Sequence, residues 1–269
     1  MRHLLFSAAF AALMAVPAAA QRFDDTISLR VEAYFAGVSS NVRVDGNNGN
    51  IGTEIDFEND LGLSDNKTLP AFELGWRIND DWVLQGQYYS LGRRTDATLD
   101  REIIVGDTVY PVNGSVGAGF DSDVYRFTIG NLLIQREGLE VGLGIGLHGT
   151  DFTVFIEGEG SVAGQPGQFR QEGRSIFAPL PTIGAFGQWE PAKRVIVSGR
   201  LDWLSLTIDD YSGRLINAEA AVAYRLFKHL DAGLAYRHVD YRLRVKQDDW
   251  NGRVQYEFSG PSIFLRAGF

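Results

Sequence analysis

The sequence contains no cysteine, so no disulfide holds this 269-residue chain together. Lysine is also scarce: only four of the 25 basic residues are lysine, and the rest are arginine. Arginine is favoured for fixed, multidentate ion pairs in confined places. The basic residues are outnumbered by 34 acidic ones, which gives a formal net charge of −9. A protein that binds nucleic acid needs a basic face, so this charge argues against a nucleic-acid partner.

Long apolar runs are also missing, and no stretch of 18 apolar residues occurs anywhere in the chain. This excludes transmembrane helices beyond the N-terminal segment. That segment has a basic start (Arg2, His3), an apolar stretch over 4–16 and small residues at 18–20. The pattern is typical of a secretory signal peptide cleaved before Gln21, and an uncleaved anchor is disfavoured because the apolar stretch is short. We therefore expect a signal peptide over 1–20 and one domain over 21–269.

The rest of the chain is dominated by alternation of apolar and polar residues. In 27–35 (ISLRVEAYF), 72–78 (FELGWRI) and 139–149 (LEVGLGIGLHG), every second residue is apolar and most of the residues between are charged, glycine or otherwise polar. A period of two over about ten residues indicates a β-strand. No segment shows a comparable helical stripe.

The connections between the alternating segments come in two kinds. Short polar ones occur at 79–81, 135–138, 190–193 and 228–231, and longer ones occur at 45–66, 95–120, 158–174, 209–213 and 246–251. Short turns at one end and long loops at the other are typical of an outer-membrane β-barrel. Four short turns, with both termini at the same end, predict ten antiparallel up-and-down strands, and one misassigned turn would make eight or twelve. The predicted strands are 27–44, 66–78, 82–95, 121–134, 139–156, 175–189, 194–207, 215–227, 232–245 and 252–269.

A soluble β-sandwich or a lipocalin-like barrel is the alternative for a chain of alternating strands. In those folds the apolar face points inward, but here the other face carries charges and glycines and few bulky aliphatic residues. Gly142, Gly144 and Gly146 would leave voids in a soluble core, whereas in a membrane barrel they make room for long charged neighbours. Aromatic residues also fall where membrane interfaces are expected, namely Trp76, Trp82, Trp189, Tyr224 and Phe269. These patterns favour the membrane barrel.

The C-terminal stretch SIFLRAGF resembles the C-terminal signature of bacterial outer-membrane β-barrel proteins, which end in phenylalanine with apolar residues at alternate positions before it. The segments APLPTIGAFGQW, YRLFKHLDAGLAYR and DFENDLGLSDNKTLPAFELGWRIN are similar to segments of small proteobacterial barrels of the OmpA/OmpW-like group. The resemblance implies a Gram-negative outer-membrane barrel whose last strand, ending at Phe269, is the signal read by the barrel-assembly machinery. It implies an architecture and no particular chemistry.

Twelve charged residues fall on the faces predicted to point into the lumen. They are Arg30, Glu32, Glu73, Arg77, Arg126, Glu140, Arg200, Asp202, Glu219, Arg225, Arg237 and Arg266. Because the two signs are mixed, we interpret them as an ion-pair network that fills a narrow barrel. A selectivity lining for a pore tends toward rings of one sign and is the alternative.

Histidines offer little support for catalysis. His148 has Asp151 three residues on, His238 has Asp240 beside it at a predicted bulge, and His229 falls in a short turn. An Asp–His pair could act in acid–base catalysis, which keeps a barrel hydrolase as a weaker alternative. No Gly-x-Ser-x-Gly motif is present, so we predict no catalytic residues.

Two loops have distinctive compositions. The acidic loop 45–66 resembles a calcium loop only loosely, because its glycines and asparagines are out of order for an EF-hand, and we predict a solvated loop without a metal site. The stretch 95–120 reads as two β-prone arms around Gly106–Asp107, a hairpin signal. This hairpin and the glycine-rich tip 157–168 are candidates for surface contacts.

The sequence as a whole predicts an integral outer-membrane barrel with a structural or surface-interaction role and a plugged or narrow lumen. A small-solute channel is the alternative. The expected partners are outer-membrane lipid, lipopolysaccharide, the barrel-assembly machinery and an unidentified surface ligand, with no cofactor.

Overall fold

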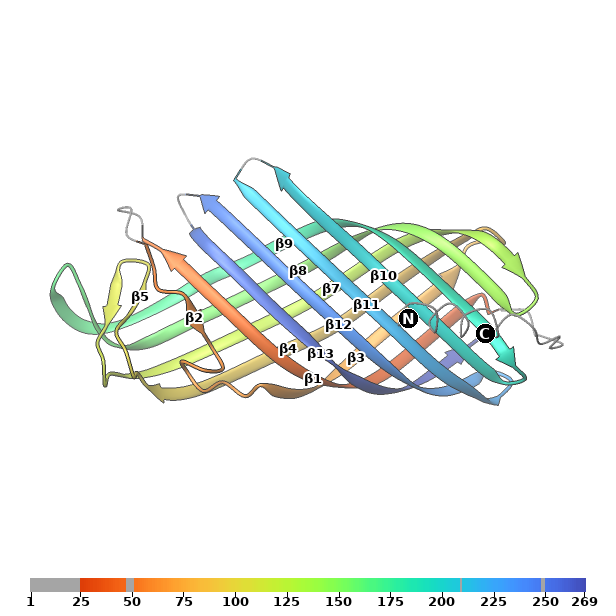
Figure 1. The fold of residues 1–269 in the computed structure, drawn as a ribbon, viewed down its shortest axis with the longest axis horizontal. Coiled ribbons are helices and arrows are strands. Elements are labelled where there is room, and N and C mark those ends of the chain that lie inside the picture. The colour runs from red at the N-terminus through yellow and green to blue at the C-terminus, as the bar shows by residue number, and fades with distance from the viewer. Residues whose placement is uncertain (1–24, 47–50, 209, 248–249) are drawn as a thin grey trace, which may run out of the picture.

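Ten long antiparallel strands close into a barrel (Figure 1). The computed structural model describes residues 25–46, 51–208, 210–247 and 250–269. The ring consists of β1 (Ile27–Asp45), β3 (Asn66–Arg77), β4 (Trp82–Thr98), β7 (Ser115–Arg136), β8 (Leu139–Val162), β9 (Gln165–Ala192), β10 (Val195–Ile208), β11 (Tyr211–Phe227), β12 (Leu230–Gln247) and β13 (Trp250–Gly268). Each strand pairs with the next, and β1 pairs with β13 to close the ring. The predicted all-β antiparallel barrel of about ten strands is confirmed.

The tight turns gather at the end of the barrel where Ile27 and Phe269 meet (Figure 1). The strands on either side of the four predicted short connections are separated there by two to four residues. Two of these turns use a left-handed residue, Gly138 (φ 69°) and Arg194 (φ 70°). The predicted signal peptide over 1–20 lies outside the described residues.

At the opposite end, the loop predicted over 158–174 is wrong. Strands β8 and β9 continue to a two-residue turn at Ala163–Gly164, whose φ angles are 51° and 76°. Two consecutive positive φ values give a turn whose twist matches that of the flanking strands. The stretch is therefore a long hairpin.

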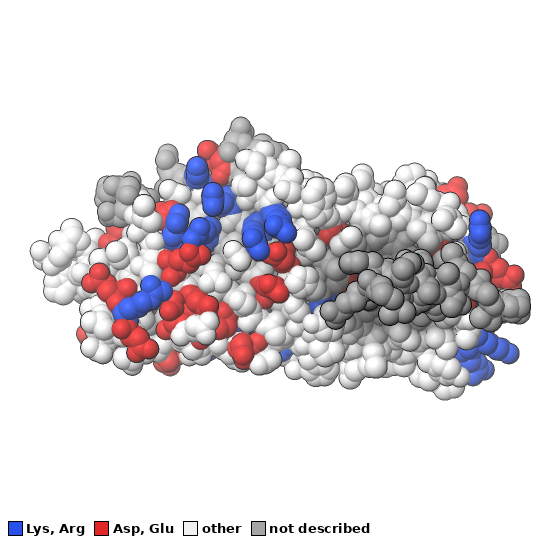
Figure 2. All heavy atoms as spheres, viewed as in Figure 1, with Lys and Arg blue, Asp and Glu red and all other residues white. Residues whose placement is uncertain are grey.

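A band of apolar side chains faces outward from the half of the barrel nearest the termini. On β8, Leu143, Ile145 and Leu147 are 53%, 66% and 45% exposed. Neighbouring strands add Phe127, Ile129, Ile183, Leu201, Trp203, Val222, Leu234, Ile263 and Leu265. A contiguous exposed apolar surface of this kind marks a membrane-contacting face. In Figure 2 the charged residues gather at the far half and at the terminal end, on either side of this band.

The polarity of the two faces inverts beyond the band. On β12 the outward residues change from Leu234 and Tyr236 to a polar series, which is His238, Asp240, Arg242, Arg244 and Lys246. The inward residues change in the opposite sense to buried apolar ones, which are Val239, Tyr241, Leu243 and Val245. The far half of the wall is thus built like a soluble barrel. The bulge predicted at His238 is wrong, because the β12–β13 register is continuous there.

The wall is interrupted between β9 and β10. Their pairing runs from Ala192 and Val195 to Ile183 and Trp203 and then stops, although β10 continues to Ile208. Pro181 and Pro179 follow on β9, and proline has no N–H to donate to a neighbouring strand. The lipid-facing surface is hollowed at this level by an apolar depression of about 670 Å³.

No helix among the described residues is long and apolar enough to cross a membrane.

Candidate functional site in the barrel lumen

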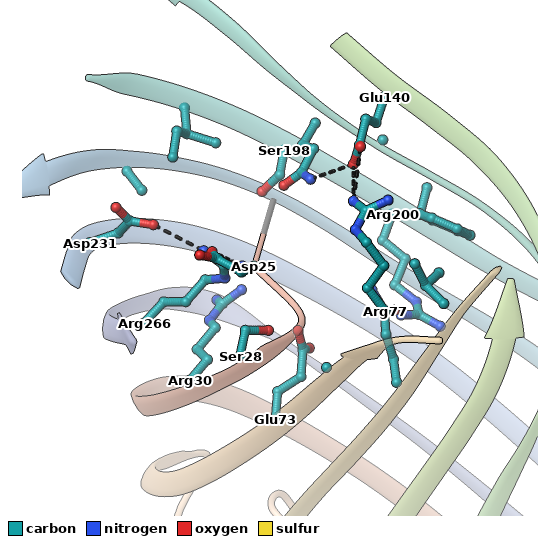
Figure 3. A pocket seen from close by; sticks show the side chains of 18 of the residues that line it. Asp25, Ser28, Arg30, Glu73, Arg77, Glu140, Ser198, Arg200, Asp231 and Arg266 are labelled. Atoms are coloured by element: carbon teal, nitrogen blue, oxygen red, sulfur yellow. Dashed lines mark hydrogen bonds and ion pairs between the residues drawn. The ribbon is translucent and has the colours of Figure 1, made fainter. Parts of the chain in front are cut away.

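The lumen near the termini is filled by an ion-pair network, here called the lower network. It consists of the twelve predicted charged residues together with Asp25 and Asp231, and each of the twelve has an oppositely charged partner. A cavity of about 180 Å³ remains among part of the network, and Figure 3 shows Arg30, Arg77, Glu140 and Arg266 among the side chains that line it. The network is therefore dense but leaves room for a few water molecules.

Glu219 on β11 is the first node of the lower network. Its carboxylate accepts hydrogen bonds from Arg30 Nη1 at 2.6 Å and from Arg237 Nε at 3.0 Å. Arg30 Nη2 also lies 2.7 Å from Glu32 Oε2, and Arg237 Nη2 lies 3.5 Å from the same oxygen. Two guanidinium groups and two carboxylates thus alternate across β1, β11 and β12. Since burying one unpaired charge is costly, this cluster joins three strands firmly.

Asp202 on β10 is the second node. It accepts hydrogen bonds from Arg126 Nη1 at 2.9 Å and Arg200 Nε at 2.8 Å. Arg126 Nη2 also lies 3.6 Å from Glu73 Oε2, which extends the node to β3. Arg200 donates to Thr128 Oγ1 at 2.6 Å. This node therefore bridges the lumen between β7 and β10.

Four further ion pairs lie close to the end of the barrel where Ile27 and Phe269 meet. Arg77 Nη2 is 2.8 Å from both oxygens of Glu140. Asp231 accepts from Arg225 Nε and Arg266 Nη1, both at 3.1 Å, and Arg266 Nη2 lies 2.9 Å from Asp25. Arg77, Glu140, Asp231, Arg266 and Asp25 all line the same cavity (Figure 3).

Asp25 and Asp231 are the members that sequence reasoning missed. Asp25 precedes the first alternating segment, and Asp231 lies within the stretch interpreted as a turn. Asp231 lies an even number of residues from the inward-facing Arg237, so both side chains lie on the same face of β12. This spacing identifies Asp231 as inward-facing because β12 begins at Leu230 and therefore includes it.

Glycines in this half admit aromatic rings as well as charged groups. A Cβ on Gly142 or Gly130 would lie 2.5 Å from the ring of Phe186, and a Cβ on Gly233 would lie 2.4 Å from the ring of Phe264. The Arg30 guanidinium carbon is 3.8 Å from the centre of the Phe264 ring, a cation–π contact. The prediction that the β8 glycines make room for charged neighbours is thus wrong: an aromatic ring fills the space at Gly142, and threonine side chains and backbone atoms lie against Gly144 and Gly146.

Above the lower network lies a polar layer built around His148. Its side chain is fully buried and points inward, and neither ring nitrogen has a hydrogen-bond partner among the described residues. Tyr241 and Tyr256, farther from the membrane band, are also fully buried. Burial raises the pKa of both tyrosines above the usual range, so their hydroxyls stay neutral.

The far half of the lumen holds an aromatic core, here called the upper core. Phe152 contacts Tyr241 and Tyr256 with ring centres 5.1 Å and 5.2 Å apart, and Phe120 lies 6.1 Å from Phe152 and 6.0 Å from Tyr256. Tyr256 stacks on Phe258 at 5.3 Å. The expectation that the inward faces lack bulky apolar residues is therefore wrong in this half, because the polarity of the faces inverts there.

The acidic loop folds over the upper core and is not solvated as predicted. Ile55, Phe57, Leu61 and Leu63 are each 3% exposed or less. Glu58 pairs with the buried Arg93 and accepts from the Ser40 amide at 2.7 Å and the Ser40 hydroxyl at 2.8 Å. The loop, here called the lid (51–65), is therefore fastened by both apolar and ionic contacts.

The remaining lid carboxylates shape its turns. Asp56 accepts from the Glu58 and Asn59 amides at 3.1 Å and 2.9 Å, and Asp60 pairs with Arg101 at 2.7 Å. No group of three or more histidine, aspartate or glutamate side chains suited to a metal ion occurs among the described residues.

The predicted hairpin around Gly106–Asp107 is confirmed as β5 (Ile103–Val105) and β6 (Thr108–Tyr110). It does not protrude as expected. Ile103 and Tyr110 are fully buried, Tyr110 donates to the Ile156 carbonyl at 3.1 Å, and β6 pairs with β8. The Ile104 carbonyl accepts from the Thr53 amide at 2.8 Å, which links the hairpin to the lid. Together they roof the lumen.

Neither of the two predicted histidine–aspartate contacts is found among the described residues. His148 and Asp151 differ in parity along β8 and so point to opposite faces. His238 faces outward, where its Nδ1 lies 3.0 Å from Ser259 Oγ and 3.7 Å from Glu257. The His229 ring stacks on Phe269 at 5.8 Å.

Phe269 seals the seam between the first and last strands. Its carbonyl accepts from the Thr26 and Ile27 amides at 2.6 Å and 3.0 Å, and its amide donates to the Ile27 carbonyl at 2.8 Å. The phenyl ring remains 70% exposed at the edge of the apolar band.

The chain is similar in fold to the outer membrane protease OmpT from Escherichia coli, with a TM-score of 0.59 and 10% sequence identity over 96% of this chain and 100% of that chain. Weaker similarity extends to Neisserial surface protein A (TM-score 0.34, 11% identity, 91% of this chain and 97% of that one). The outer membrane protein OprG from Pseudomonas aeruginosa has a TM-score of 0.35 and 10% sequence identity over 91% of this chain and 97% of that one. No protein-family model and no curated protein matches the chain.

At 10% identity the similarity to OmpT establishes the fold alone. The ten-stranded ring, the exposed apolar band and the short turns beside both termini agree with that fold. The prediction of a small barrel of the outer-membrane type is confirmed for the fold: the chain is an antiparallel β-barrel similar in fold to an outer-membrane barrel protein.

Proposed function

We propose that this protein is a closed barrel with a structural or surface-interaction role, and that it neither conducts solutes nor catalyses a reaction. The observation that carries the proposal is the double closure of the lumen. The lower network fills one half, and the upper core, roofed by the lid and the β5–β6 hairpin, fills the other. Either closure alone obstructs a narrow barrel.

The alternatives have less support. A channel needs a continuous passage, and mixed charges locked in pairs do not form a selectivity ring. A hydrolase needs a nucleophile and a positioned acid–base pair, and no histidine–carboxylate pair in the described lumen supplies one.

The test is conductance in planar bilayers. We expect the native protein to give no steady current, because both closures would have to open at once. A variant that lacks residues 53–64 and carries Phe120→Ala, Phe152→Ala and Glu140→Ala serves as the open control, since it removes the lid, opens the upper core and unpairs Arg77 beside the cavity. We expect brief, anion-preferring openings from this variant. Large and stable openings from the native protein would refute the closed lumen and favour a channel.

We also propose that Phe269 is the residue read by the barrel-assembly machinery. Its exposed ring and its place at the seam support this role. Deletion of Phe269 should lower the outer-membrane level of the protein severalfold and leave degraded protein in the periplasm. Phe269→Tyr, which keeps an aromatic ring, is the matched control. Fractionation and immunoblotting report both, and normal membrane levels of the deletion variant would disprove the role.

A further inference from the structure

The outer flank of the barrel carries a row of arginines that the lumen does not use. Arg43 on β1 stands directly opposite Arg253 on β13, and Arg253 stands directly opposite Arg244 on β12. Like charges in directly opposed cross-strand positions destabilise a sheet. The protein is acidic overall, so this gathering of positive charge runs against its general composition.

The three arginines line a cleft of about 440 Å³, together with Lys246, Asp45, Asn251 and Gly252. Figure 2 shows basic residues gathered on this flank, over the ends of β1, β12 and β13 farthest from the termini. Four cations and one carboxylate thus surround a single hollow.

Among the described residues, the carboxylates near the cleft neutralise only part of this charge. Asp45 is occupied by Arg43, at 2.9 Å and 3.1 Å, and by the Gly52 amide at 3.0 Å. Glu54, which does not line the cleft, forms an ion pair with Arg253. No hydrogen bond or ion pair joins the side chain of Arg244 or Lys246 to another residue within the described ranges. An arginine fork and a lysine ammonium are therefore left to bind an anion.

The height of the cleft indicates which anion. Arg244 lies eight residues beyond Tyr236, the last large aromatic residue facing outward on β12. Eight residues span about 26 Å along a strand, which corresponds to about 20 Å above the membrane band at the usual strand tilt. This is above the headgroup layer, at the level of saccharide attached to the outer leaflet. The cleft opens sideways toward that saccharide.

We propose that this cleft, formed by Arg43, Arg244, Lys246 and Arg253, binds the phosphate groups of the core saccharide of lipopolysaccharide in the surrounding leaflet. Arginine forks match phosphate oxygens in a bidentate manner, and lysine adds a point charge. The inference rests on the surface-interaction role proposed above and names its partner. It does not depend on whether the lumen conducts.

The test compares binding to the full-length protein in detergent micelles. The probes are purified lipopolysaccharide and the same lipopolysaccharide after chemical dephosphorylation. The cleft variant is the double substitution Arg244→Gln and Arg253→Gln, and the matched control is Arg94→Gln, an exposed arginine of β4 outside the cleft. Each variant is first shown to be folded by its resistance to unfolding in sodium dodecyl sulfate without heating, which is seen as a shift in mobility on a gel.

We expect the double variant to bind phosphorylated lipopolysaccharide at least about tenfold more weakly than the native protein, since charge-assisted hydrogen bonds are lost. Arg94→Gln should bind like the native protein, and dephosphorylated lipopolysaccharide should not distinguish any of the three. Equal binding by the native protein and the double variant would overturn the site. Equal binding of both probes to the native protein would overturn phosphate recognition.

A third probe separates the source of the anion. Tighter binding of a soluble sulfated saccharide than of lipopolysaccharide would overturn the assignment to the leaflet. The readout is also separate from conductance, so a closed lumen with no lipopolysaccharide binding would refute this inference and leave the closure standing.

Discussion

Replacing Arg237 with methionine should lower the free energy of unfolding by about 3–5 kcal/mol, because it strands buried carboxylates. The Arg237 side chain is 1% exposed and contacts Glu219 and Glu32. Without it, two carboxylates share Arg30 alone. Methionine keeps most of the volume, so the loss measures charge pairing and not a cavity. Urea unfolding in lipid vesicles, followed by tryptophan fluorescence, measures the change.

Two controls make this result specific. Arg94→Met removes an arginine whose side chain is 68% exposed and should cost less than about 1 kcal/mol. Combining Arg237→Met with Glu219→Gln removes a stranded charge and should recover part of the loss, as a double-mutant cycle detects. A loss below about 1 kcal/mol for Arg237→Met would mean that the lower network does not stabilise the barrel.

The strands near the termini could be predicted because one physical rule governs them. Lipid on one side and ion pairs on the other give an uninterrupted period of two, as at Leu143, Ile145 and Leu147. The same rule identified the charged residues that point inward, since residues two positions apart on a strand share a face. The sequence could not predict which arginine pairs with which carboxylate. Arg30 and Glu219 are 189 positions apart, and only the closure of the ring brings them together.

The half of the barrel farthest from Phe269 was harder to predict. Its strands also alternate with a period of two, but their apolar residues face the lumen and their polar residues face outward. Val239, Tyr241 and Leu243 alternate with Asp240 and Arg242. In a membrane strand this pattern would indicate a bulge that shifts the two faces. Here the strand continues without a bulge beyond the apolar band, and its apolar residues face the lumen. The sequence carried the signal, namely charged residues at outward positions for four or five consecutive steps.

The lid was misjudged for a different reason. Its aspartates, asparagines and glycines are typical of a solvated turn-rich loop. Only tertiary contacts show that Phe57 and Leu61 are anchored inside the mouth. Glu58 gives no local signal that it meets Arg93, a residue 35 positions away.

Replacing Phe120 with alanine should test the upper core, with an expected loss of about 3–5 kcal/mol from the cavity it leaves. Phe120 is fully buried, and its ring lies 6.1 Å from Phe57 of the lid and 5.5 Å from the Arg93 guanidinium carbon. Its removal should therefore also loosen the lid. Unfolding in vesicles measures the first effect, and limited proteolysis within 51–65 measures the second.

The matched control lies on the same strand and faces the other way. Phe127 is 59% exposed on the lipid side, so Phe127→Ala leaves no cavity, since lipid fills the space. We expect it to cost about 1.5 kcal/mol, near the lower end for transfer of a phenylalanine side chain, and to leave the lid resistant to protease. If the two variants lose the same stability and their lids are cut at the same rate, the upper core does not close the barrel. If only Phe120→Ala exposes the lid, the far half of this wall is a packed core held above the membrane.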